Sequence, residues 1–117
     1  MARGSVVLVP FPFDDLSTTK VRPAVCLTDP IDPIGPHRHV ILAFITSQIP
    51  TDLLESDVVL DANQADFTTT GLRVSSTLRL HRLMTVTTTL IRRELGELSP
   101  RMQAEVAERL RKLFGLT

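Results

Sequence analysis

Positively charged side chains are concentrated in the second half of the chain. Residues 71–93 contain five arginines and no acid, whereas residues 51–70 contain five acids and no Lys or Arg. Arg79 and His81 are two residues apart, so on a strand they face the same way. A guanidinium binds phosphate oxygens, and a neutral imidazole accepts a proton. The pattern is a modest indication of an anion-facing surface; taken alone, it favours the alternative, a set of solvated arginines balanced by the acidic run.

Two side chains in the first half also suit a phosphate. Arg22 precedes Pro23, which restricts Arg22 to extended backbone and helps to fix its direction. Thr46 ends a β-branched run, and its hydroxyl can donate to a phosphate oxygen. Gln48 shares the side of Thr46 if the strand continues. Taken alone, the sequence favours ordinary roles for both: Arg22 as a surface arginine leading into a strand, and Thr46 as a β-branched strand residue.

The histidines and the cysteine do not indicate a metal site. His37 and His39 alternate without a third ligand nearby, so we expect a loop-to-strand edge rather than zinc. Cys26 lies in an apolar run, and we expect it in the core. A lone cysteine forms no internal disulfide. We therefore expect neither a metal nor another cofactor.

The composition is that of a globular domain. The 117 residues are 43% hydrophobic and 22% charged, and the formal net charge is +0. This balance excludes coating of nucleic acid or membrane by bulk charge, so a polyanionic partner needs a local cluster. No apolar run approaches the ~18–20 residues of a membrane span, and the N-terminus lacks the apolar core of a signal peptide. We expect one domain over residues 1–117, located in the cytoplasm.

Short β-branched runs, separated by turn-forming residues, predict strands. Seven are predicted, at residues 5–9, 22–28, 39–46, 57–61, 74–80, 83–86 and 90–95. Strands this short and closely spaced favour a small barrel or sandwich.

The C-terminal residues predict a helix instead. Ser99 and Pro100 are a favourable N-cap and first helical residue, and Gly115 is a plausible stop. Glu–Arg and Glu–Lys pairs at i,i+4 support this helix, at Glu105/Arg109 and Glu108/Lys112. An apolar stripe at helical spacing predicts its core-facing side, formed by Met102, Val106, Leu110, Leu113 and Phe114.

Five sequence blocks follow one another along nearly the whole chain: RGSVVLV at 3–9, KVRPAV at 20–25, ITSQ at 45–48, GL at 71–72 followed by SSTLRLHRLMTV at 75–86, and LGELS at 95–99. Their order and spacing resemble the MazF/PemK family, the ribonuclease toxins of bacterial toxin–antitoxin pairs. The segment VPFPFDD at 9–15 is more similar to the PemK-like branch.

The resemblance implies a mainly β fold, a small SH3-like barrel of strongly bent antiparallel sheet with a C-terminal α-helix. It also implies a homodimer and an antitoxin partner. The implied activity is metal-independent cleavage of single-stranded RNA. In that reaction the ribose 2′-hydroxyl attacks phosphorus, and the products are a 2′,3′-cyclic phosphate and a 5′-hydroxyl.

The resemblance also implies site residues. Arg22, Thr46 and Arg79 match catalytic positions of the family. His81 falls where PemK-like members usually carry Asp, the proposed base, and our hypothesis is that His81 replaces it. Residues expected to contact RNA are Lys20, Ser47, Gln48, Arg73, Arg82 and Phe13. The alternative for Phe13, as for Phe11, is core or dimer packing.

Three departures from the family pattern leave other functions open. Ser5 stands where an acid is usual, an upstream Glu used by some members is missing near Ser17, and His81 replaces the Asp. One alternative is therefore a degenerate, non-catalytic module of the same fold that binds RNA or antitoxin. Another is a gyrase poison like the CcdB relatives, but these bind through C-terminal residues that include a Trp, and this chain has no Trp.

Overall fold

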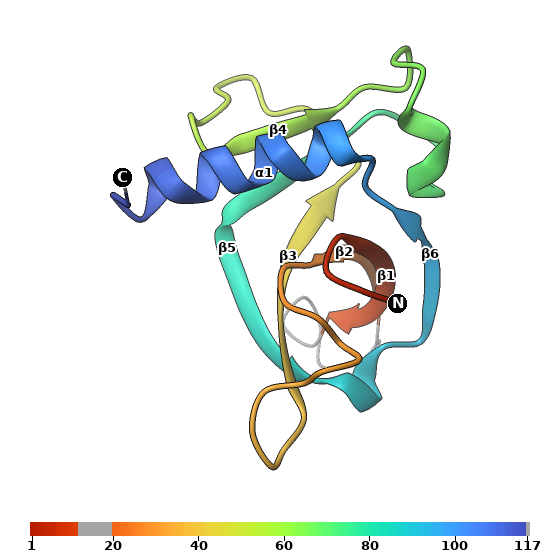
Figure 1. Ribbon diagram of the computed structural model, residues 1–117. Helices are drawn as coiled ribbons and strands as arrows, with labels where there is room; N and C mark the ends of the chain where they lie inside the picture. The colour runs from red at the N-terminus through yellow and green to blue at the C-terminus, as the bar shows by residue number, and fades with distance from the viewer. Residues whose placement is uncertain (12–19, 117) are drawn as a thin grey trace.

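The computed structural model describes residues 1–11 and 20–116, so the predicted RNA contact Phe13 and the position Ser17 lie outside the described residues. The strands are β1 (Ser5–Phe11), β2 (Lys20–Cys26), β3 (His39–Thr46), β4 (Asp57–Leu60), β5 (Ser76–Thr87) and β6 (Arg93–Glu97). They form one antiparallel sheet in the order β4-β5-β3-β2-β1-β6. Figure 1 shows this sheet curled into a half-barrel, with the C-terminal helix α1 (Pro100–Leu113) lying next to β4. The expected mainly β barrel with a C-terminal helix is confirmed.

The strand β5 joins two strands that the sequence analysis predicted separately. It runs without interruption through His81 and Arg82, where two polar residues suggested a break. The register between β3 and β5 shifts here: Ala43 pairs with Leu83, whereas Ile45 pairs with Leu78. An irregularity of this kind accommodates extra residues within a strand and increases its bend. The polar stretch therefore stays in the sheet and points to solvent.

The structure contains two short 3-10 helices that were not predicted, and one of them changes a predicted strand boundary. Thr88–Leu90 form η2, capped by the Thr87 hydroxyl, which accepts from Thr89 N at 3.2 Å. For this reason β6 begins at Arg93, later than the predicted start at residue 90. The second, η1 (Phe67–Thr70), was not predicted at all.

The sheet buries apolar side chains on both faces. Because side chains alternate along a strand, neighbours such as Val6 and Val7 enter different clusters. One cluster packs beneath α1 and contains Val25, Ile45, Leu78, Leu80, Met102 and Val106 among its members. The opposite cluster contains Val7, Val9, Ala24, Cys26, Val40, Leu42 and Val86. Cys26 is thus in the core, as predicted.

The predicted helix is confirmed, but its apolar stripe is only partly buried. Ser99 Oγ caps the helix by accepting from Met102 N at 3.1 Å, and Met102 and Val106 are buried. Leu113 and Phe114 are 39% and 57% exposed, so their assignment to the core was wrong. Figure 1 shows the reason, since the C-terminal end of α1 extends past β5.

The side-chain pairs predicted along α1 are also only partly formed. Glu105 pairs with Arg109 as predicted, at 3.2 Å. Glu108 pairs with Arg111, three residues on, at 2.8 Å. Gly115 follows the helix with φ of +68°, a conformation suited to the predicted stop.

Candidate functional site

Arg22 and Thr46 lie on neighbouring strands of the sheet. The β2–β3 ladder pairs Ala24 with Phe44. Arg22 and Thr46 are each two residues farther along, just past the last regular pair, and residues two apart share a face. Both therefore lie on the face of Ala24 and Phe44, opposite to α1. Both side chains are half-buried.

The sheet order continues this face into β5. Thr46 pairs directly with Thr77 across the β3–β5 ladder. Thr77 and Arg79 alternate with Leu78 and Leu80, which pack beneath α1, so they point to the same side as Thr46. Adjacent strands are ~4.8 Å apart and alternate residues ~7 Å apart. The three predicted groups of Arg22, Thr46 and Arg79 are therefore neighbours on one face.

The hydroxyl of Thr77 has an unusual environment for a position between Thr46 and Arg79. Thr77 Oγ1 is buried and has no hydrogen-bond partner among the described residues. Most buried polar atoms in folded proteins are paired, and exceptions often have a functional explanation. No sequence pattern indicates this unpaired hydroxyl, because threonine is an ordinary strand residue.

Arg79 is held by Asp57, a residue that the sequence analysis did not select. The two are paired across the β4–β5 ladder. Arg79 Nε donates to Asp57 Oδ1 and Nη2 donates to Oδ2, both at 3.1 Å. The Asp57 side chain is 0% exposed and that of Arg79 is 24% exposed. Nη1 of Arg79 has no hydrogen-bond partner among the described residues, so it is available to an anion.

His81 lies beside the same carboxylate. Its Nδ1 is 3.9 Å from Asp57 Oδ1, and its side chain is 34% exposed. Arg79 and His81 do face the same way, as predicted from their spacing. Asp57 escaped notice because its only signal was membership of an acidic run, and the residues that it contacts follow 22 and 24 positions later.

The residues predicted to contact RNA are spread more widely. Lys20 begins β2 and is exposed. Ser47 and Gln48 are exposed in a bend, and Gln48 N donates to Thr46 Oγ1 at 3.2 Å. The strand thus ends at Thr46, and the condition for Gln48 to share its side is not met. Arg82 is exposed next to His81, whereas Arg73 is exposed in a bend before β5, six residues from Arg79.

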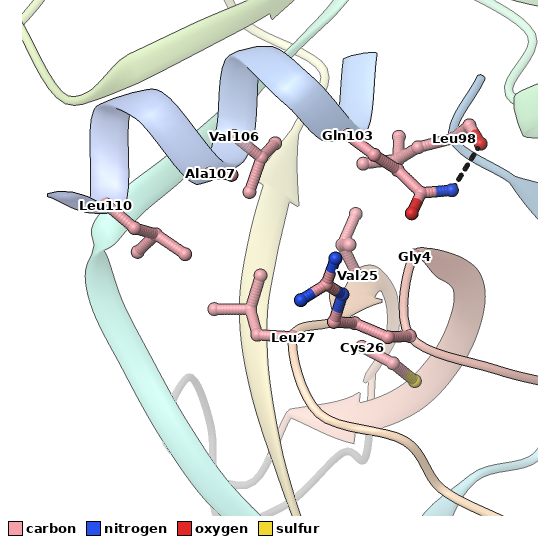
Figure 2. A pocket seen from close by; sticks show the side chains of 10 residues that line it. Gly4, Val25, Cys26, Leu27, Leu98, Gln103, Val106, Ala107 and Leu110 are labelled. Atoms are coloured by element: carbon pink, nitrogen blue, oxygen red, sulfur yellow. Dashed lines mark hydrogen bonds between the residues drawn. The ribbon is translucent and has the colours of Figure 1, made fainter. Parts of the chain in front are cut away.

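A pocket exists elsewhere, on the α1 side of the sheet. Figure 2 shows Val106 and Leu110 of α1 on one side of this pocket, with Val25 and Leu27 on the other. Gln103 Nε2 donates to the Leu98 carbonyl at its edge, at 3.0 Å. Cys26 also lines it, and burial, with a contribution from the Glu94 charge, raises the pKa of its thiol to about 11. The Cys26 side chain itself belongs to the core cluster on the opposite face of the sheet, and a buried neutral thiol is a poor nucleophile. The candidate site is therefore the polar cluster formed by Arg22, Thr46, Asp57, Thr77, Arg79 and His81.

Metal-binding groups do not gather in the part of the chain that is described. No three His, Cys, Asp or Glu side chains there form a group able to hold a metal ion. His37 and His39 approach each other only as a tilted pair of rings, with centroids 5.9 Å apart.

A family profile described as "PemK-like, MazF-like toxin of type II toxin-antitoxin system" matches residues 2–114. The chain belongs to this family. The match spans all the blocks on which the resemblance was based, and it establishes the protein as a MazF-like toxin of a type II toxin–antitoxin system. Curated protein sequences gave no match.

Solved structures share the fold of this MazF-like toxin. Mycobacterium tuberculosis toxin MazF-mt6 is 22% identical, with a TM-score of 0.72 over 97% of this chain and 98% of that one. An endoribonuclease in complex with its cognate antitoxin, from a mycobacterial species, is 15% identical, with a TM-score of 0.74 over 100% and 97%. The MazE–MazF complex from Deinococcus radiodurans is 20% identical, with a TM-score of 0.72 over 100% and 97%.

Ser5, the first departure of this MazF-like toxin from the family pattern, has a structural place. Its hydroxyl donates to Glu94 Oε2 at 2.8 Å and accepts from Ala2 N at 2.9 Å. Ser5 is the first residue of β1, which lies beside β6 in the sheet, so these bonds connect the N-terminus to β6.

In the described part of the toxin, no helix has the length and apolar character needed to cross a membrane.

Proposed function

We propose that this MazF-like toxin is an endoribonuclease that cleaves single-stranded RNA without a metal ion and thereby inhibits translation and growth. The observation that carries the proposal is the placement of Arg22, Thr46 and Arg79 on one face of three neighbouring strands. Family membership supplies the second support. The comparisons include proteins described as endoribonucleases.

In this proposal all three of these groups bind the scissile phosphate. Arg22 has several donors and a permanent charge, which suit the oxygens that become more negative during attack. Thr46 Oγ1 accepts from Gln48 N, so its own O–H is left to donate to a non-bridging oxygen. Arg79 adds the donors of its Nη1.

His81 is the base in this proposal. Its imidazole takes the proton from the ribose 2′-hydroxyl, whose oxygen forms a bond to phosphorus. The bond from phosphorus to the 5′-oxygen breaks, and that oxygen takes a proton from water. The products are a 2′,3′-cyclic phosphate and a 5′-hydroxyl. The substrate supplies its own nucleophile, so no metal-bound water is needed.

The proposed partners follow from the family. A type II system pairs the toxin with an antitoxin protein, and two of the similar structures are described as complexes with an antitoxin or with MazE. We therefore propose that this toxin binds a cognate antitoxin and acts as a homodimer. Lys20, Ser47, Gln48, Arg73, Arg82 and Phe13 stay proposed contacts to RNA.

The test combines purified protein, a sequence-diverse single-stranded RNA pool and EDTA. Cleavage is expected to persist in EDTA, to leave 2′,3′-cyclic phosphate ends, and to disappear in Arg22→Ala. Arg111→Ala is the matched control, because Arg111 lies in the last turn of α1, away from the cluster.

The competing function is a non-catalytic module that binds RNA or antitoxin. Under that alternative the wild-type protein retains RNA on a filter but produces no cut ends at any pH. Complete absence of cleavage across the pool would overturn the endoribonuclease proposal in favour of this module.

A further inference from the structure

We propose that Asp57 is a positioning residue that fixes the Arg79 guanidinium and orients His81, so that Nε2 of His81 takes the proton from the 2′-hydroxyl. The part concerning catalysis rests on the proposed function. The part concerning geometry does not, because it concerns the state of the free protein.

The Asp57 carboxylate is buried, and both of its oxygens accept hydrogen bonds. Its side chain has 0% exposure, and Arg79 contacts both of its oxygens at 3.1 Å. Oδ2 also accepts from Leu54 N at 2.9 Å, and Asp57 N donates back to the Leu54 carbonyl at 3.0 Å. A buried carboxylate with this many bonds has little freedom, so it serves as a fixed reference for the groups around it.

The contact with Asp57 fixes the orientation of the Arg79 guanidinium. Nε and Nη2 both donate to Asp57, so the position and the plane of the guanidinium are fixed, and the donors of Nη1 are left for a substrate. A two-point contact of this kind pre-organises the donor before substrate binds, which lowers the cost of reorganisation during the reaction. Lysine in place of Arg79 has no comparable second point of contact.

His81 takes its direction from the same oxygen. Nδ1 lies 3.9 Å from Asp57 Oδ1, which is longer than a hydrogen bond. Catalytic contacts are often long in the free enzyme and tighten when substrate binds. The edge of the ring with Nδ1 faces a buried carboxylate, and about a third of the side chain is exposed. In this proposal the opposite edge, which carries Nε2, is the one that meets the substrate.

The charge of Asp57 selects the tautomer. A carboxylate oxygen is attractive to Nδ1 only when Nδ1 carries the hydrogen, and the lone pair is then on Nε2. The charged side chains next to His81 on the sheet are Asp57 on β4 and Arg79 and Arg82 on β5. Asp57 is the only one of these with a described contact to the ring.

This arrangement accounts for His81 at the position where PemK-like members usually carry an Asp. Where a carboxylate acts directly as base, one residue is sufficient. Here the carboxylate comes from β4 and lies behind an imidazole, which takes the proton while O2′ bonds to phosphorus and the bond to O5′ breaks. The imidazolium that results has its Nδ1–H toward Asp57, which stabilises it, and it later returns the Nε2 proton to water.

The geometric part is tested by ¹⁵N NMR of histidine-labelled toxin, with His81 assigned by comparison with His81→Gln. At a pH where the ring is neutral, wild-type His81 is expected to carry its proton mainly on Nδ1. In Asp57→Asn the population is expected to move toward the Nε2–H form that free histidine prefers. A wild-type His81 that is mainly Nε2–H overturns the proposal, and this result needs no variant to fold.

The catalytic part is tested by cleavage kinetics across pH. Asp57→Asn is expected to lower kcat at least about tenfold with little change in KM, less than the ~10²–10⁴-fold expected for loss of the base in His81→Gln. Asp66→Asn is the matched control, because Asp66 also binds an arginine through two bonds but lies outside the cluster. Folded Asp57→Asn with wild-type kcat and an unchanged acid limb of its pH profile contradicts the proposal. Failure of the wild type to cleave any RNA refutes the proposed function and the catalytic part together, whereas the tautomer still decides the geometric part.

Discussion

Asp66 and Arg101 form a two-point ion pair that connects η1 to the first turn of α1. Arg101 Nε and Nη2 donate to the two carboxylate oxygens, each at 2.9 Å. Ser99, the cap of α1, donates to Asp66 Oδ2 at 2.6 Å. One carboxylate thus holds the segment between β4 and β5 against the start of the helix that covers the sheet.

The first prediction concerns the pH dependence of this contact. The hydrogen bond from Arg101, and then that from Ser99, lowers the pKa of Asp66 from 3.8 to about 2. Because the folded-state pKa is the lower one, the stabilisation is complete above pH 3.8 and disappears as the pH falls toward 2. Asp66→Asn should therefore have a lower Tm than wild type at pH 7, and the gap should close over that range. Thermal melts at matched pH values measure it, and a gap independent of pH would refute the assignment.

The second prediction concerns the Thr46 hydroxyl. Thr46→Val keeps the shape of the side chain but removes the donor, so kcat for RNA cleavage should fall on the order of 10²-fold, as when one donor to a developing oxyanion is lost. Thr46→Ser retains the hydroxyl and should keep most of the activity. Single-turnover cleavage of an RNA oligonucleotide compares the two variants. Equal activity in both would exclude a catalytic role for this hydroxyl.

The third prediction separates the structural from the chemical contribution of Arg79. Arg79→Gln leaves the buried Asp57 carboxylate without its cation, which should lower the free energy of unfolding by about 1–3 kcal/mol. Arg79→Lys preserves the charge with a single point of contact and should lose less stability. Both should cleave RNA poorly, since neither presents the Nη1 donors. Urea unfolding at neutral pH gives the stabilities, and a Gln variant as stable as wild type would contradict the burial argument.

The fourth prediction uses two glycines of nearly equal conformation. Gly71 and Gly35 have φ of +73° and +70°. A Cβ at Gly71 would lie 2.1 Å from the Leu95 carbonyl oxygen, whereas nothing lies within 4 Å of one at Gly35. Gly35→Ala should cost only the left-handed strain of about 1–2 kcal/mol. Gly71→Ala should lose a further ~1–3 kcal/mol through the backbone clash. Unfolding in urea that gives equal losses would contradict this close approach of η1 to β6.

The fifth prediction concerns the reactivity of Cys26. The thiol is buried, and its pKa is raised to about 11, so very little thiolate forms near neutral pH. A thiol reagent at pH 8 should leave the native protein unmodified for as long as it stays folded. Complete reaction is expected in guanidinium, which serves as the control. Rapid modification of the native state would show that the core around β2 opens readily.

The strands and the helix were largely predictable from local patterns. Alternating and β-branched runs located β1, β3 and β4, because burial on a sheet face selects those side chains. The cap at Ser99 and the apolar spacing that follows predicted α1, because the first turn of a helix needs an acceptor for its free amides. The continuity of β5 was missed, because a strand can tolerate polar residues where its register shifts.

The sequence by itself determined the family resemblance, and with it the expected roles of Arg22, Thr46 and Arg79. It also determined that Arg79 and His81 share a face, since alternation is a property of any strand. Only the tertiary structure decided that Asp57 lies between them, because that contact depends on the register of β4 against β5, which joins residues more than twenty positions apart. Exposure of the C-terminal end of α1 was likewise decided by where the sheet ends, and no local pattern encodes that position.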